Sequence, residues 1–199
     1  MADEKDDLDR VRDENDDDDD ENDDGERAER GEQLTVHLDT ESGLLALIVP
    51  SELRRWADDN SWWTEIDNLI DEANNGRIVP IETGREGGYA VRVTFASLSE
   101  REQRFAAQSA LFWLRIPEDE EVAVVSGDEL SFPDTAGTAS FWASPGAYRV
   151  IVTRLRWTQE EDDSYEDALP DYVVRLLPLS PGEATPDIQD IPDLALEDD

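Results

Sequence analysis

The only histidine of the chain, His37, and the carboxylate of Asp39 could act as a general base and the group that orients it. They are two residues apart in a segment where Leu34, Val36 and Leu38 alternate with polar residues. Both side chains should therefore lie on the polar face of one strand. The chain offers no nucleophile for this pair, because it has no Cys and no Gly-x-Ser-x-Gly elbow. We interpret His37 as a surface residue of a strand and predict no catalytic residue.

Two other patterns could hold ions or phosphates. Asp20, Asn22, Asp24 and Gly25 match positions 1, 3, 5 and 6 of an EF-hand calcium loop, but position 12, which should be Glu, is Gly31. Such a partial match is expected by chance in an Asp-rich run. The chain contains neither Gly-x-x-x-x-Gly-Lys nor Gly-x-Gly-x-x-Gly, the two Gly-rich motifs that bind phosphate groups. We therefore predict no metal site and no cofactor.

The acidic charge is concentrated at the two ends of the chain. The 199 residues include 52 Asp and Glu against 17 Lys and Arg, a net charge of −35. Residues 1–32 hold 18 acidic and 5 basic residues, and residues 180–199 hold 7 acidic and no basic residues. Such segments bury too little apolar surface to offset the entropy lost on ordering. The sequence thus predicts disordered acidic tails at 1–32 and 180–199 around a single β-rich domain at 33–179.

The composition also limits location and partners. Cys is absent, and five of the first nine residues are acidic with no apolar stretch among them, unlike a secretory signal. The longest apolar stretch, 43–50, is far shorter than the roughly 20 residues that span a bilayer. An anionic membrane surface or a nucleic acid would repel the chain. We expect a cytoplasmic protein with no direct nucleic-acid or membrane partner, and no oligomeric state can be deduced.

Apolar periodicity predicts an α+β domain of mainly antiparallel sheet or sandwich with two or three short helices. Residues 34–38 and 44–49 are expected to form one hairpin, and 78–81 and 89–95 another around the loop 83–88. Helices are expected at about 50–57, 61–74 and 99–109. Further strands are expected at 111–116, 122–125, 138–142, 148–157 and 172–177.

Tryptophan and arginine indicate where a partner could bind, since these residues often dominate interfaces. Trp56 lies beside Arg54 and Arg55, and is the first candidate for a surface anchor. Trp157, between Arg154 and Arg156 on one side and an acidic loop on the other, is the second. The C-terminal tail alternates acidic and apolar residues, a pattern that can dock as a short motif in a groove with a basic rim. Its apolar residues are Ile188, Ile191, Leu194 and Leu196.

Three segments carry a resemblance to a known family. Residues 145–152 read Pro-Gly-Ala-Tyr-Arg-Val-Ile-Val, residues 171–178 read Asp-Tyr-Val-Val-Arg-Leu-Leu-Pro, and residues 126–130 read Ser-Gly-Asp-Glu-Leu. This part of the chain resembles the C-terminal hairpin of small bacterial β-sandwich proteins of the ComJ-like type. The resemblance implies a β-sandwich that inhibits a nuclease by binding it, and it supplies no catalytic residues.

Three functions follow as hypotheses. The first is a non-enzymatic binding or inhibitor protein whose acidic surface meets a basic protein partner. The second is an accessory or scaffold protein of a salt-adapted organism, whose acidity serves only the solvent; 16 of the 17 basic residues are Arg, which fits this hypothesis and also a GC-rich genome. The third is a hydrolase that uses only carboxylates, with pairs such as Asp58 and Asp59 or Asp128 and Glu129 as acid and base.

Overall fold

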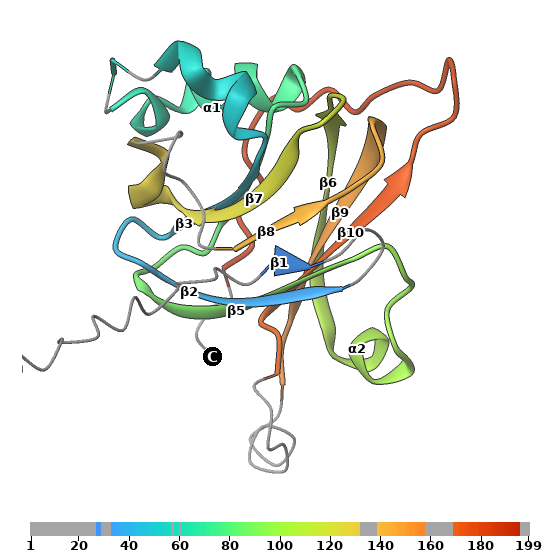
Figure 1. Ribbon diagram of the computed structural model, residues 1–199. Helices are drawn as coiled ribbons and strands as arrows, with labels where there is room; N and C mark the ends of the chain where they lie inside the picture. The colour runs from blue at the N-terminus through green and yellow to red at the C-terminus, as the bar shows by residue number, and fades with distance from the viewer. Residues whose placement is uncertain are drawn as a thin grey trace, which may run out of the picture.

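Two five-stranded sheets pack face to face in the computed structural model, which describes residues 27–28, 33–56, 58–59, 61–131, 139–157 and 169–195 (Figure 1). Sheet A has the strand order β1-β8-β7-β3-β4, and sheet B has the order β2-β5-β10-β9-β6. The strands are β1 Arg27–Ala28, β2 Leu34–Thr40, β3 Leu44–Ile48, β4 Ile78–Glu82, β5 Gly87–Thr94, β6 Ala106–Ile116, β7 Glu121–Ser126, β8 Ala139–Trp142, β9 Gly146–Leu155 and β10 Tyr172–Pro178.

Antiparallel pairing dominates both sheets. The exceptions among the described strands are β1 with β8 and β10 with β5, which pair in parallel. The helices are short: 3₁₀ helices η1 Pro50–Trp56, η2 Trp62–Thr64 and η3 Gly127–Ser131, and α-helices α1 Ile66–Asn74 and α2 Glu100–Phe105. The predicted class, mainly antiparallel sheet with a few short helices, is confirmed. No helix in the described part of the chain is long and apolar enough to cross a membrane.

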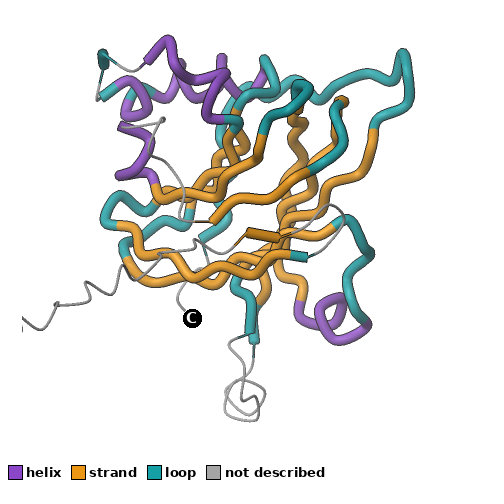
Figure 2. Tube along the Cα trace, viewed as in Figure 1, coloured by secondary structure: helices purple, strands orange, loops and turns teal. Residues whose placement is uncertain are grey.

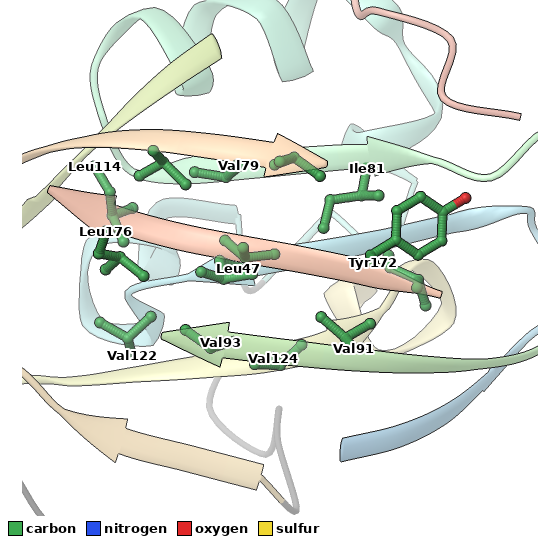
Figure 3. Packing of buried hydrophobic residues seen from close by; sticks show 14 of the residues in the cluster. Leu47, Val79, Ile81, Val91, Val93, Leu114, Val122, Val124, Tyr172 and Leu176 are labelled. Atoms are coloured by element: carbon green, nitrogen blue, oxygen red, sulfur yellow. The ribbon is translucent and has the colours of Figure 1, made fainter. Parts of the chain in front are cut away.

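The main core lies between the sheets. Alternate residues of facing strands fill it, among them Leu47 and Val79 from sheet A and Val91, Val93 and Leu176 from sheet B (Figure 3). Each of these side chains is at most 1% exposed. Close packing of this kind supplies most of the hydrophobic free energy of folding.

A second, smaller core lies on the other face of sheet A. There the residues of β3 that point away from sheet B, Leu44, Ala46 and Ile48, pack against Leu53 of η1 and Trp62 of η2. Figure 2 shows the helical segments gathered over this face at one corner of the molecule, with α2 alone at the opposite corner. Since β3 is covered on both faces, its sequence is a continuous apolar run.

Both predicted hairpins are wrong. Strand β2 pairs with β5 in sheet B, whereas β3 pairs with β4 and β7 in sheet A. The turn at 41–43 and the loop at 83–86 therefore carry the chain from one sheet to the other. The physical reason lies in the burial of the strands: β2 has one polar face, which suits the outer side of sheet B, while β3 must be covered on both sides.

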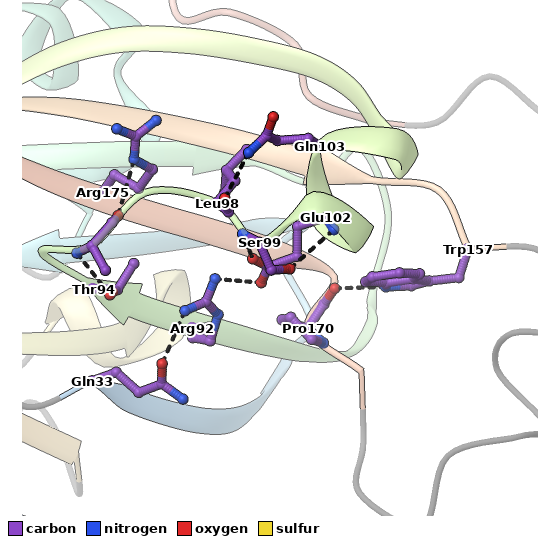
Figure 4. Close-up of polar contacts among 11 residues, drawn as sticks. Gln33, Arg92, Thr94, Leu98, Ser99, Glu102, Gln103, Trp157, Pro170 and Arg175 are labelled. Atoms are coloured by element: carbon purple, nitrogen blue, oxygen red, sulfur yellow. Dashed lines mark hydrogen bonds and ion pairs between the residues drawn. The ribbon is translucent and has the colours of Figure 1, made fainter.

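The third predicted helix is shorter than expected. Its start is confirmed, because Ser99 and Glu102 form a capping box. Helix α2 ends at Phe105, however, and residues 106–109 belong to β6. Glu102 also forms an ion pair with Arg92 of β5, and Arg92 donates a 3.0 Å hydrogen bond to Gln33 (Figure 4). These contacts fix α2 at the outer side of sheet B.

The predicted end of the domain at residue 179 is too early. After β10 the chain runs back across the molecule (Figure 1), and residues 180–195, which we call the C-terminal strap, lie along it. Ile191 is 6% exposed and Leu194 is 1% exposed. The acidic composition hid this burial, because the buried residues are spaced widely among Pro and Asp. Of the N-terminal segment 1–32, only Arg27 and Ala28 are described, and they pair with Ser140 and Phe141.

Candidate functional site

Trp56, the first predicted anchor, is half-buried in a polar cluster around Glu72. Its indole Nε1 donates a 2.7 Å hydrogen bond to Oε1 of Glu72, a side chain with no exposed surface. The same carboxylate forms ion pairs with Arg55 and Arg77. The ring of Trp56 stacks on Trp62 with centroids 5.1 Å apart. Trp56 and the guanidinium of Arg55 thus make contacts within the domain, while the Arg55 side chain is 51% exposed.

Arg54, the third member of this predicted anchor, is exposed. Partner binding by Trp56, Arg54 and Arg55 stays a prediction. The contacts within the cluster give Trp56 and Arg55 a structural role besides it.

Trp157, the second predicted anchor, lies beyond the end of β9, next to α2. Its indole Nε1 donates a 2.9 Å hydrogen bond to the carbonyl of Pro170 (Figure 4). Its ring lies 5.1 Å from the ring of Phe105, and the Arg101 guanidinium lies 5.2 Å from its centroid. Trp157 is half-buried and lines a cavity described below.

The apolar residues of the strap pack onto the domain itself. Ile191 belongs to the second core, Leu194 belongs to the main core, and Ile188 packs against both. The side chain of Asn74 holds the strap through two hydrogen bonds to the backbone of Ile188. The prediction that Ile188, Ile191 and Leu194 form a free docking motif in a disordered tail is therefore wrong. Leu196 lies outside the described residues.

One candidate site is a cavity of about 540 Å³ at one end of sheet B. Strands β2 and β9 end there, and β5 and β10 begin there. Polar and aromatic residues of β2, β5 and β9, and of the segments after β9 and before β10, line it. They include His37, Asp39, Tyr89, Arg154, Arg156, Trp157 and Asp171. The predicted pair His37 and Asp39 is exposed at its rim, and the lining residues include no Ser, Thr or Cys that it could activate.

Arg154 is the residue of this cavity that sequence reasoning undervalued. The sequence marks it only as a neighbour of Trp157. It follows Tyr148, Val150 and Val152 in the alternation of β9, so its side chain occupies a position of the inward face. A charged residue at an apolar position of a strand is the signal that could have identified it.

The buried guanidinium of Arg154 contacts two tyrosine rings and one carboxylate. Its guanidinium lies over the ring of Tyr172, 4.6 Å from the centroid, and 5.8 Å from that of Tyr89. Nη1 of Arg154 is 3.0 Å from Oδ1 of Asp171, but the two are not aligned for a hydrogen bond. Burial raises the pKa of the Tyr172 phenol well above its usual value, although the charge of Arg154 opposes this shift.

A second, more open groove of about 740 Å³ adjoins the cavity, and Asp39 lines both. The groove is formed where the chain crosses between the sheets, at the end of β2 and the start of β5, together with the end of β7. Four exposed carboxylates and no basic residue are among its lining residues, which are Asp39, Thr40, Glu41, Glu86, Gly87, Ser126 and Asp128. We call these seven residues the acidic groove.

Local hydrogen bonds hold the walls of the acidic groove. The backbone N–H of Glu41 donates to Oδ2 of Asp128 at 2.9 Å, and the hydroxyl of Thr40 donates to the carbonyl of Leu44 at 3.0 Å. Gly43 turns the chain with φ +70°, and a Cβ there would lie 3.1 Å from the backbone N of Arg85. The groove is therefore a fixed feature of the two crossovers.

The carboxylate pairs proposed for a hydrolase have local structural roles. Oδ1 of Asp59 accepts hydrogen bonds from the backbone and hydroxyl of Ser61. Oε2 of Glu129 accepts from the backbone N–H of Ser126 at 2.8 Å. Within the described ranges, no three His, Asp or Glu side chains are grouped so as to hold a metal ion. The EF-hand-like residues Asp20, Asn22, Asp24 and Gly25 lie outside those ranges.

Comparison with known proteins places the chain in a family. Residues 32–161 match the model of DUF6386, a family of unknown function. The chain belongs to this family. The DUF6386 match includes Asp39, Glu86, Asp128 and Arg154, and it ends before β10 and the strap. No curated protein matches the chain.

Among solved structures, the protein named "Crocagin biosynthetic gene J" has a TM-score of 0.49 and 17% identity to this DUF6386 member. The match covers 74% of this chain and 97% of that chain. Neither comparison brought out a ComJ-like protein, so that resemblance stays a prediction.

Proposed function

We propose that this DUF6386 protein is a non-enzymatic binding protein that receives a basic protein partner in the acidic groove. The observation that carries the proposal is the composition of the groove: Asp39, Glu41, Glu86 and Asp128 converge on one concave surface with no Lys or Arg among the lining residues. A surface of this kind suits the guanidinium and ammonium groups of a partner.

The charge of the whole chain supports the same proposal. With a net charge of −35, the protein attracts cationic partners from a distance and orients them before contact. Such steering raises the association rate and makes it sensitive to salt, since charges are screened beyond about 10 Å at 0.1 M ionic strength. The inhibitor role implied by the ComJ-like resemblance is one form that this binding could take. A cytoplasmic location belongs to the proposal, supported by the lack of cysteine.

Capture of basic proteins at low salt tests the proposal. We would compare the wild-type protein with a groove variant, Asp39→Asn/Glu41→Gln/Glu86→Gln. A matched control, Glu65→Gln/Asp67→Asn/Glu118→Gln, removes the same number of exposed charges elsewhere. The proposal predicts capture of a basic protein by the wild type and the control, with weaker capture by the groove variant. Equal capture by all three would contradict it.

The second candidate is an accessory or scaffold protein whose acidity is an adaptation to salt, and the near absence of Lys favours it. Circular dichroism and Trp fluorescence across a KCl series, from about 0.05 M to several molar, separate the two candidates because this range screens the carboxylates progressively. Folding only above about 1 M would support solvent adaptation. A fully folded domain in dilute buffer would support the basic partner.

A further inference from the structure

The cavity next to the acidic groove contains a buried cation with unused hydrogen-bond donors. Arg154 is 7% exposed, and its Nε and Nη1 are sealed from solvent without a hydrogen-bond partner. Buried polar groups are nearly always paired, and an unpaired N–H on a charged group is costly. A buried, incompletely paired guanidinium that lines a cavity therefore indicates that the cavity receives an anionic group.

Asp171 does not fully supply this anion. Its Oδ2 accepts a 2.9 Å hydrogen bond from the backbone N–H of Ala90, and its Oδ1 lies 3.0 Å from Nη1 of Arg154 without forming a hydrogen bond. The backbone N–H and carbonyl of Asp171 are also used, by Ala90 and Leu155. Asp171 is thus held in place by the strands, and two donors of Arg154 remain without an acceptor among the described residues.

The shape and lining of the cavity fit a small group with an apolar portion. Its volume of about 540 Å³ exceeds what one water or ion fills. Trp157 and Leu169, both half-buried, offer apolar surface beside Arg154 and Arg156. A planar carboxylate is the natural acceptor for an arginine fork.

The surrounding charge excludes a simple anion as the best ligand. The two arginines of the cavity are matched by Asp39 and Asp171, and the whole chain carries −35, so a free anion would be repelled on approach. A ligand with net positive charge and one carboxylate avoids this repulsion. The acidic groove joins the cavity at Asp39 and at the adjacent residues Gly87 and Gly88, so one extended ligand could occupy both.

We infer that the cavity receives the C-terminal carboxylate of the basic partner, whose preceding basic residues lie in the acidic groove. The inference rests on the proposed function and extends it, because it assigns the polarity of the bound chain and the group at its end. The C-terminal carboxylate approaches the Arg154 guanidinium, and the last side chain packs against Trp157 and Leu169.

Two pools of fluorescein-labelled hexapeptides test the inference by fluorescence anisotropy. Both carry three arginines followed by three randomised residues; one pool ends in a free carboxylate and the other in a carboxamide. On the unaltered protein, we expect the acid pool to bind about tenfold more tightly, as for one charge-assisted pair. Arg154→Met, which keeps the apolar stem, should abolish this difference. The comparison of the pools needs no variant, so it holds even if Arg154→Met does not fold.

Each other outcome overturns the inference in a distinguishable way. Equal binding of both pools, weakened in the groove variant, would retain the proposed function and refute the carboxylate site. The carboxylate site is equally refuted if neither pool binds while basic proteins are captured through the groove. Failure of both peptides and proteins would refute both proposals. Binding of N-acetylglycine as tightly as the acid pool would assign the cavity to a free small carboxylate instead.

Discussion

The side-chain amide of Asn74 forms two hydrogen bonds with the backbone of Ile188, a residue 114 positions later in the chain. Nδ2 donates to the carbonyl of Ile188 at 2.9 Å, and Oδ1 accepts from its N–H at 2.8 Å. This pair fixes the start of the buried part of the strap at the end of α1. Farther along, the N–H of Leu194 donates to the carbonyl of Glu82 at 3.1 Å, so the strap pairs with the free edge of β4 at the last residue of that strand.

Asn74→Ala should loosen the strap. Two half-buried hydrogen bonds are lost and the backbone of Ile188 is left unpaired, which should lower the free energy of unfolding by about 2 kcal/mol. Urea denaturation followed by Trp fluorescence measures the change. The control is Asn75→Ala, which removes one exposed hydrogen bond to the carbonyl of Asp71. Similar losses in the two variants would show that the strap contributes little to stability.

The same strap should respond to pH through Glu82. Burial raises the pKa of the Glu82 carboxyl, and the charges of Asp193 and Asp190 on the strap raise it further. A carboxyl whose folded pKa exceeds its unfolded value of about 4.3 costs nothing while protonated, and lowers stability as the pH rises through the folded pKa. Glu82→Gln should therefore stabilise the protein at pH 7.

That gain should vanish below about pH 4, where the carboxyl is protonated in both states. Unfolding free energies of the wild type and Glu82→Gln between pH 3 and 8 give the difference, with the exposed Asp67→Asn as control. A difference that is independent of pH, or a loss of stability at pH 7, would refute the repulsion between Glu82 and the strap.

Much of the secondary structure could be predicted from the sequence, but the strand pairing could not. Alternation at Leu34, Val36 and Leu38 identified β2 and its buried face, because that pattern is local. Which strand lies beside it depends on both cores at once. The short turn before Leu44 has the residues of a hairpin, yet it crosses between the sheets, since β3 must be covered on both faces.

The candidate site was predicted only in part. The basic partner, suggested by the charge, the lack of catalytic groups and the ComJ-like resemblance, stays a prediction, whereas Trp157 at the cavity was identified from its type. The acidic groove could not be predicted, because Asp39, Glu86 and Asp128 come from three segments that only the two crossovers bring together. The strap was missed because its acids suggested disorder, whereas burial of Ile191 and Leu194 offsets the entropy lost on ordering.

Glu72→Ala should be far more damaging than any change at the surface of α1. The carboxylate of Glu72 has no exposed surface and pairs with Arg55, Arg77 and the indole of Trp56, so its loss leaves buried donors and a cation without an acceptor. We expect a loss of about 3–5 kcal/mol in the free energy of unfolding, measured by urea denaturation. Asp67→Ala, an exposed change on the same helix, should cost less than about 1 kcal/mol. Comparable costs would refute the structural role assigned to the cluster.

Binding in the acidic groove is tested most directly by titrating fluorescein-labelled hexa-arginine with the wild type, the groove variant and the matched control variant. If the groove is the binding site, binding should be about tenfold weaker for the groove variant at 0.05 M KCl and less than about twofold weaker for the control, and 1 M KCl should remove the difference. Equal weakening of both variants would mean that only net charge attracts the peptide. In that case the acidic groove would not be the binding site.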